Sequence, residues 1–131
     1  MSGLYAGKDG TYTRMSVATG DLKDDWVTAL LVQGDDVYVG TYAGGVTRLR
    51  RSGASLQHTH LGGGCINPAG LAVAGDTLYA ATMEGLLARP PGDDNATWRT
   101  FPSAAPGRDV TAVRKVGDAL WVGSRRGVGV M

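Results

Sequence analysis

The chain has 131 residues, a mass of 13.6 kDa and a net charge of +1 from 13 basic and 12 acidic residues, which is the size of one domain. This balance of charge argues against a nucleic-acid partner, since such binding needs clustered Lys and Arg. No apolar run approaches the roughly 18 residues of a membrane span, so we expect no membrane segment and no signal peptide. The lone cysteine, Cys65, fits a reducing compartment, and we predict a cytoplasmic location.

Residues 3–6 and 11–15 align with the third and fourth strands of a repeat that runs through the rest of the chain, and are therefore predicted to be strands. A longer alternating run follows, is interrupted by Gly34-Asp35, and then resumes. A two-residue turn that contains glycine predicts a β-hairpin here, because glycine supplies the positive φ that such turns require. The 21 glycines, spread along the chain, indicate many short strands joined by turns.

Two more strands are expected after this hairpin, at residues 46–49 and 56–60. The same order of four strands then returns along the chain. Its most regular feature is the Gly-Asp turn, which recurs at intervals of 41 and 42 residues as Gly34-Asp35, Gly75-Asp76 and Gly117-Asp118. A period of about 40–50 residues is typical of a four-stranded propeller blade.

The repeat divides the chain into three units. No stretch has apolar residues at helical spacing over ten or more residues, so the predicted fold is all-β. Two units are expected at 26–66 and 67–108, and the third is split between 109–131 and 1–25. The C-terminal part supplies the first three strands of the split unit, while the N-terminal part supplies the third and fourth. We therefore predict a single domain, 1–131, that contains about three blades.

Several segments carry a resemblance to a known repeat: Trp26-Val27-Thr28-Ala29-Leu30, Val37-Tyr38-Val39-Gly40-Thr41, Gly44-Gly45-Val46-Thr47-Arg48-Leu49 and Leu120-Trp121-Val122-Gly123-Ser124. With them the chain resembles the two-component regulator propeller repeat over nearly its whole length. The resemblance implies a β-propeller of four-stranded antiparallel blades. In that family the repeats usually form the sensor part of larger membrane-bound regulators. The sequence shows no kinase or DNA-binding segment, so we carry over no signalling role.

Three blades are too few for a closed ring, because known propellers hold four to eight. An open arc of three blades would expose two apolar sheet faces. We therefore predict a homodimer that forms a six-bladed ring, in which the terminal strands of each copy complete the split blade of the other. A trimer would give nine blades, beyond the usual range. A segment of a longer propeller is the alternative, and it too would have to associate.

Ligands in a propeller usually bind at the loops that join the fourth strand to the next first strand and the second strand to the third. From these loops we take five candidate ligand-binding residues: Asp25, Trp26, Tyr42, Arg108 and Arg125. Their mixture of charges and aromatic rings suits a small ligand, a sugar or a peptide at the channel mouth. The alternative is that they are ordinary solvated loop residues.

Neither a metal site nor a catalytic set is expected. His58 and His60 lie two apart on a predicted strand and so share a face, with Cys65 nearby, but two ligands do not make a site. We interpret both histidines as surface residues. No Ser or Cys lies in a strained nucleophile turn, and the glycines at 62–64 lack the Lys-Ser or Lys-Thr of a phosphate loop. We expect no cofactor.

The sequence favours a non-enzymatic, self-assembling propeller that acts as a binding or interaction scaffold. The alternative function is a sensor-like or lectin-like propeller that binds a carbohydrate or another small ligand. Equivalent loop positions hold Tyr42, Met83 and Arg125, which differ and so argue against one site repeated in every blade. A propeller lyase or hydrolase is least favoured, because it needs a histidine-acid pair and a metal at the channel mouth.

Overall fold

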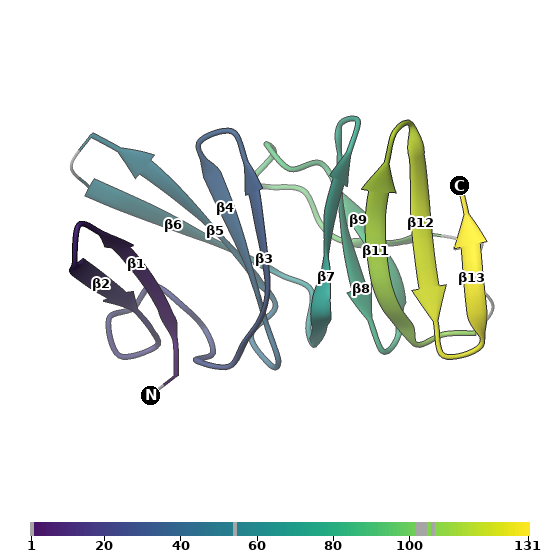
Figure 1. Ribbon diagram of the computed structural model, residues 1–131, viewed down its shortest axis with the longest axis horizontal. Helices are drawn as coiled ribbons and strands as arrows, with labels where there is room; N and C mark the ends of the chain where they lie inside the picture. Colours follow the sequence, from purple (N-terminus) through teal and green to yellow (C-terminus); the bar gives the residue numbers. More distant parts are fainter. Residues whose placement is uncertain (1, 54, 102–104, 106) are drawn as a thin grey trace.

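The computed structural model describes residues 2–53, 55–101, 105 and 107–131 (Figure 1). The fold is all-β, as predicted, with 62% of the described residues in strands. The described residues contain thirteen strands and no helix, so no helix among them could cross a membrane. The strands form a hairpin and three antiparallel sheets.

Within each sheet the strands follow one another in chain order. The N-terminal hairpin consists of β1 (Leu4–Lys8) and β2 (Thr11–Met15). Sheet 1 consists of β3 (Val27–Gln33), β4 (Asp36–Thr41), β5 (Val46–Ser52) and β6 (Ser55–Gly62). Sheet 2 consists of β7 (Ile66–Ala74), β8 (Thr77–Thr82), β9 (Gly85–Arg89) and β10 (Arg99–Phe101). Sheet 3 consists of β11 (Val110–Val116), β12 (Ala119–Ser124) and β13 (Gly127–Val130).

The Gly-Asp turns lie where the repeat predicts them, between the first two strands of each sheet. Gly34, Gly75 and Gly117 have φ of 60°, 59° and 58°. A positive φ at the first central residue is what a type II′ hairpin turn requires, and its twist matches that of the strands. An added Cβ would meet no atom within 4 Å at any of the three positions, so backbone conformation alone selects glycine there.

The sheets stand side by side along the molecule, in the order of the chain (Figure 1). Their first strands touch one another, β3 against β7 and β7 against β11. The N-terminal hairpin lies beside sheet 1 at one end of the molecule, and sheet 3 forms the other end. Within one chain the two parts of the split unit are therefore far apart, and β1–β2 forms a separate two-stranded sheet.

The core consists of three apolar layers, one at each boundary between these elements. The layer between sheets 1 and 2 contains Ala29, Tyr38, Val46, Leu61, Ile66, Leu71, Leu78 and Ala80. The layer between sheets 2 and 3 contains Ala72, Ala81, Leu86, Ala105, Val110, Val113, Leu120 and Val122. Under the N-terminal hairpin lie Met15, Leu22, Val39 and Leu49. Sheet 2 is thus covered on both faces, whereas sheet 3 is covered on one.

Candidate functional site

The turns predicted to carry a ligand site lie along one edge of the molecule, the lower edge in Figure 1, which we call the loop edge. A hydroxyl residue ends the second strand of each sheet there: Thr41, Thr82 and Ser124. In sheet 2, Thr82 Oγ1 donates to the Gly85 carbonyl at 2.7 Å and accepts from the Glu84 N–H at 3.2 Å. Ser124 makes the same pair of bonds in its own turn, and Thr41 makes them with Gly45 and Gly44, one residue further along a turn that is one residue longer. A hydroxyl group therefore ties each of the three turns.

Trp26 and Tyr42, two of the predicted residues, come together at the loop edge. Their rings stack with centroids 4.7 Å apart and an interplanar angle of 20°, and both remain exposed. The Tyr42 N–H donates to the Trp26 carbonyl at 2.9 Å. Asp24, which lies in the same loop but was not among the five candidates, accepts from the N–H groups of Trp26 at 3.1 Å and Ala43 at 2.7 Å. Asp side chains often accept from nearby backbone N–H groups, so an Asp shortly before β3 was the signal in the sequence that pointed to this role.

Asp25, a third predicted residue, serves as a tie between the N-terminal hairpin and sheet 1. Its Oδ1 accepts from the Val17 N–H at 2.7 Å, and its Oδ2 lies 4.0 Å from Arg14 Nη2. Its carbonyl accepts from the Gly3 N–H at 2.8 Å. The Asp25 carboxylate is therefore already bound by groups of the protein itself.

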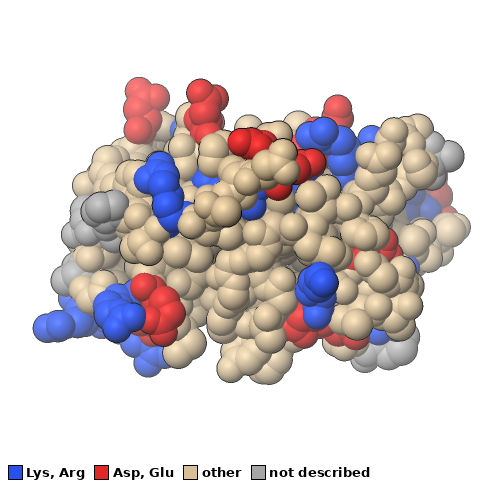
Figure 2. Space-filling model, turned by 180° about the vertical axis from the view of Figure 1, so that it is seen from behind, with Lys and Arg blue, Asp and Glu red and all other residues tan. Residues whose placement is uncertain are grey.

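Arg108 and Arg125, the remaining predicted residues, form ion pairs at the loop edge of sheets 2 and 3. Arg108 Nη2 contacts Glu84 Oε2, and Arg125 Nε lies 2.6 Å from Asp109 Oδ2. Both arginine side chains are exposed, so each pair contributes about 0–1 kcal/mol to stability. Figure 2 likewise shows basic and acidic side chains in adjacent patches. The structure thus brings Trp26 and Tyr42 into contact, whereas Arg108 and Arg125 each form an ion pair with a different acidic residue.

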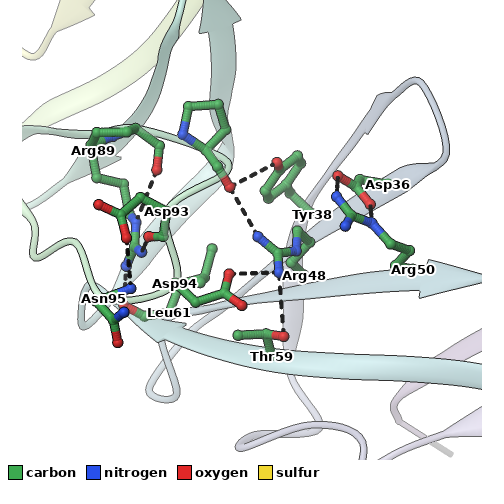
Figure 3. A network of polar contacts seen from close by, with 12 residues as sticks. Asp36, Tyr38, Arg48, Arg50, Thr59, Leu61, Arg89, Asp93, Asp94 and Asn95 are labelled. Carbon is green, nitrogen blue, oxygen red and sulfur yellow. Dashed lines mark hydrogen bonds and ion pairs between the residues drawn. The ribbon is translucent and has the colours of Figure 1, made fainter.

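A polar network that sequence reasoning missed joins sheets 1 and 2 (Figure 3). Arg48, almost fully buried, donates to the Pro91 carbonyl at 3.0 Å and contacts Asp94 Oδ1 at 2.7 Å. Arg50 forks onto Asp36 at 2.6 and 2.8 Å, and this hydrogen bonding lowers the pKa of the Asp36 carboxyl. The loop after β9 therefore folds back over sheet 1.

Arg89 is the second buried cation of this network and is only 2% exposed. Its guanidinium donates to the carbonyls of Leu61 at 3.2 Å and Asp93 at 2.7 Å, and lies over the Trp98 ring. Burial lowers the pKa of this guanidinium. Among the described residues no buried side-chain N or O lacks a hydrogen-bond partner. The network is fully occupied by protein groups and so acts as a structural clasp.

The two histidines lie on β6 and differ in burial. His58 is exposed, as predicted, with Nδ1 3.5 Å from Asp21 Oδ1. His60 was predicted to be a surface residue and is partly buried. Its Nδ1 shares a 2.9 Å hydrogen bond with Thr47 Oγ1. Burial is the main cause that lowers the pKa of His60. The described residues hold no cluster of three or more metal-ligating side chains.

A groove with a volume of about 650 Å³ lies away from the loop turns, between the N-terminal hairpin and sheet 1. On this side of sheet 1 the hairpin covers Val39 and Leu49, whereas Leu30 and Val32 are open. Leu30 is 54% exposed, whereas Leu71 and Val113 at the same repeat position are 7% and 4% exposed. We call this side, which carries Leu30 and Val32, the front face of sheet 1.

The opposite end of the molecule is apolar as well. On the outer side of sheet 3, Trp121 is 45% exposed, whereas Tyr38 at the same repeat position of sheet 1 is 2% exposed. Val128 is 66% exposed, and its equivalent Val46 is fully buried. We call this side the back face of sheet 3; it also carries Val116 and Val130, both exposed.

Comparison of the chain with protein-family models, with curated proteins and with solved structures gave no match. The resemblance to the two-component regulator propeller repeat therefore stays a prediction.

Proposed function

We propose that the protein is a non-enzymatic, self-assembling β-propeller that serves as a binding or interaction scaffold. One observation carries the proposal: Leu30 on one end face, and Trp121 and Val128 on the other, are exposed at repeat positions that are buried between neighbouring sheets elsewhere in the chain. Inside the chain, each contact between neighbouring sheets joins the back face of one sheet to the front face of the next. The back face of sheet 3 and the front face of sheet 1 are the two surfaces that such a contact needs. A second copy supplies the missing half at each end.

The energetics favour this association. Burying one large apolar side chain is worth about 1.5–3 kcal/mol, and each end face exposes several. The side chains concerned are Leu30, Val32, Val116, Trp121, Val128 and Val130. Exposed apolar patches of this kind on a soluble protein mark association surfaces. The partner that we propose is therefore the protein itself.

A front-to-back contact can close a ring or continue into a filament. Two copies that each contribute three units give six blades, within the four to eight of known propellers. Both β13 and β1 correspond to the third strand of a blade. The blade that forms where the two copies meet therefore has one strand more than the others. We propose the closed dimer, because it covers both end faces of both copies.

Light scattering coupled to size exclusion, over a dilution series, tests this proposal. The expected result is a mass twice the 13.6 kDa of the chain that does not change on dilution. A species that stays at the mass of one chain at all concentrations would contradict self-assembly.

A second candidate function, binding of a carbohydrate or another small ligand, is favoured by the Trp26–Tyr42 pair. Exposed aromatic rings present flat apolar surface together with a polar tip, which suits sugar recognition. Titration of the protein with a panel of oligosaccharides, followed by tryptophan fluorescence, tests it against the variant Tyr42→Ala. A sugar-dependent change that the variant lacks would support the site, and identical traces would exclude this role for the pair.

We propose no enzymatic role, since His58 and His60 lie on β6 and contact Asp21 and Thr47. A lyase or hydrolase would need a histidine-acid pair at the channel mouth. The cytoplasmic location stays a prediction from the sequence.

A further inference from the structure

The groove beside sheet 1 follows a strand edge that has no partner in the single chain. All five residues of β1, Leu4–Lys8, line it, although neighbouring residues of a strand point to opposite faces. Strand β1 pairs with β2 alone, so the groove runs along its free edge. Leu30, Val37 and Leu49 of sheet 1 form the opposite wall. The groove thus offers backbone hydrogen-bonding groups on one side and apolar side chains on the other.

The repeat itself shows what fills the equivalent space inside the molecule. On sheet 2, the position equivalent to Leu30 is Leu71, which is buried by residues of sheet 1. Strand β4 contacts β7 there, and its Tyr38 belongs to the same apolar layer as Leu71. The residue that corresponds to Tyr38 in sheet 3 is Trp121, which has no such cover. The place over Leu30 that corresponds to that of Tyr38 over Leu71 therefore lacks a ring. A ring of similar size, Trp121, is exposed at the other end of the molecule.

Resting on the self-assembly proposed above, we infer that the β12–β13 hairpin of a second copy occupies this groove. Trp121 of the incoming hairpin packs over Leu30 and Val32, as Tyr38 packs over β7. Its β13 lies along the free edge of β1, where backbone groups of the two strands pair. Adding a strand at an open sheet edge is a recurrent mode of recognition, with apolar contacts supplying specificity.

A face-to-face dimer, in which two Trp121 faces meet, is the competing arrangement. It would cover the back face of sheet 3 in both copies. It would leave Leu30, Val32 and the free edge of β1 open in both copies. The front-to-back arrangement covers all of these surfaces with one type of contact used twice.

Single cysteines on the two end faces distinguish the two arrangements. In a Cys65→Ser background, Leu30→Cys and Trp121→Cys are produced separately, one with a mass tag, and mixed under conditions that allow subunits to exchange. A short bismaleimide is then added and the products are weighed by mass spectrometry. Both positions are exposed in the single chain, so the folded core is not disturbed. Met83→Cys, exposed to a similar degree on the loop edge, serves as the control.

The expected product is a cross-linked pair of the two different variants, formed only in the mixture, with Met83→Cys cross-linking to neither. Linkage of Trp121→Cys to itself in the pure variant would overturn the front-to-back contact while leaving self-assembly intact. A dimeric mass without any cross-link in the mixture would also overturn it. If the Cys65→Ser parent has the mass of one chain by light scattering, the self-assembly itself fails.

Discussion

Arg89 illustrates, at the scale of single residues, how a charged side chain can act as part of a core. A guanidinium that is 2% exposed is costly to bury unless its N–H groups are satisfied, and here three backbone carbonyls and a tryptophan ring surround it. Sequence alone presents Arg89 as the polar end of a strand. Its burial depends on the loop after β9 folding back, a contact between segments that local patterns do not encode.

Replacing Arg89 should therefore destabilise the fold. Arg89→Met leaves the Asp93 carbonyl without its donor, and we expect a loss of about 1–3 kcal/mol in the free energy of unfolding. Urea titration followed by tryptophan fluorescence measures it. The matched control Arg125→Met removes an exposed arginine and should cost at most about 1 kcal/mol. Equal losses in the two variants would show that Arg89 is not a structural clasp.

His60 should make stability depend on pH. Burial lowers its pKa in the folded state below the ordinary value of 6.5; the neighbouring His58 and Lys23 lower it further, and Asp21 raises it. The unfolded chain then binds a proton more readily, so the stabilising contribution is complete above about pH 6.5 and falls as the pH drops below it. We expect His60→Gln, which can still bond Thr47, to flatten this fall between pH 7 and 5.5 in urea midpoints. A slope unchanged by the substitution would refute the assignment.

Turns and strands form the next scale, and here local chemistry predicts much of the structure. The Gly34, Gly75 and Gly117 turns and the alternating runs around them lie where the sequence indicates, because hairpin geometry depends on neighbouring residues alone. Trp26 and Tyr42 were predicted only as separate loop residues, and they stack because both flank strands of one sheet. The ion pairs of Arg108 and Arg125 were not predicted, because they depend on how separate loops approach each other.

Gly75 gives the direct test at this scale. An alanine there would meet no neighbouring atom, so any cost comes from holding a non-glycine residue at positive φ, roughly 1–2 kcal/mol. Gly92 also has open space around it but no positive φ, and Gly92→Ala should leave stability nearly unchanged. Urea unfolding of the two variants measures the difference. Similar stabilities would mean that the turn does not depend on glycine.

At the scale of the whole molecule, the end faces determine the behaviour we propose. Sheet 2 shows what a sheet of this repeat looks like when a neighbouring sheet covers each of its faces. The front of sheet 1 is covered only in part, by the N-terminal hairpin, and the back of sheet 3 has no sheet against it within the described residues. The count of repeats in the sequence already indicated three units, but only the structure shows which side chains remain open. The alignment of the repeats then indicates which contact each open side chain would make in a second copy.

Trp121 should matter for association more than for folding, because nearly half of it is exposed in the single chain. We expect Trp121→Ser to shift the dimer toward single chains by at least tenfold in dissociation constant, since burying such a ring is worth 1.5 kcal/mol or more, about tenfold per 1.4 kcal/mol. Met83→Ser, which also removes an exposed apolar side chain, should not shift it. Sedimentation velocity over a dilution series reads both, and equal dissociation constants would contradict the role of Trp121.

The most direct test of the central claim, that two copies close into one ring, is small-angle X-ray scattering on the purified protein. The prediction is a compact, flat particle with the mass of two chains, whose curve does not change with concentration and matches two copies joined front to back at both ends. A mass that grows with concentration, or an elongated particle of two chains joined at one end, would contradict closure of the ring.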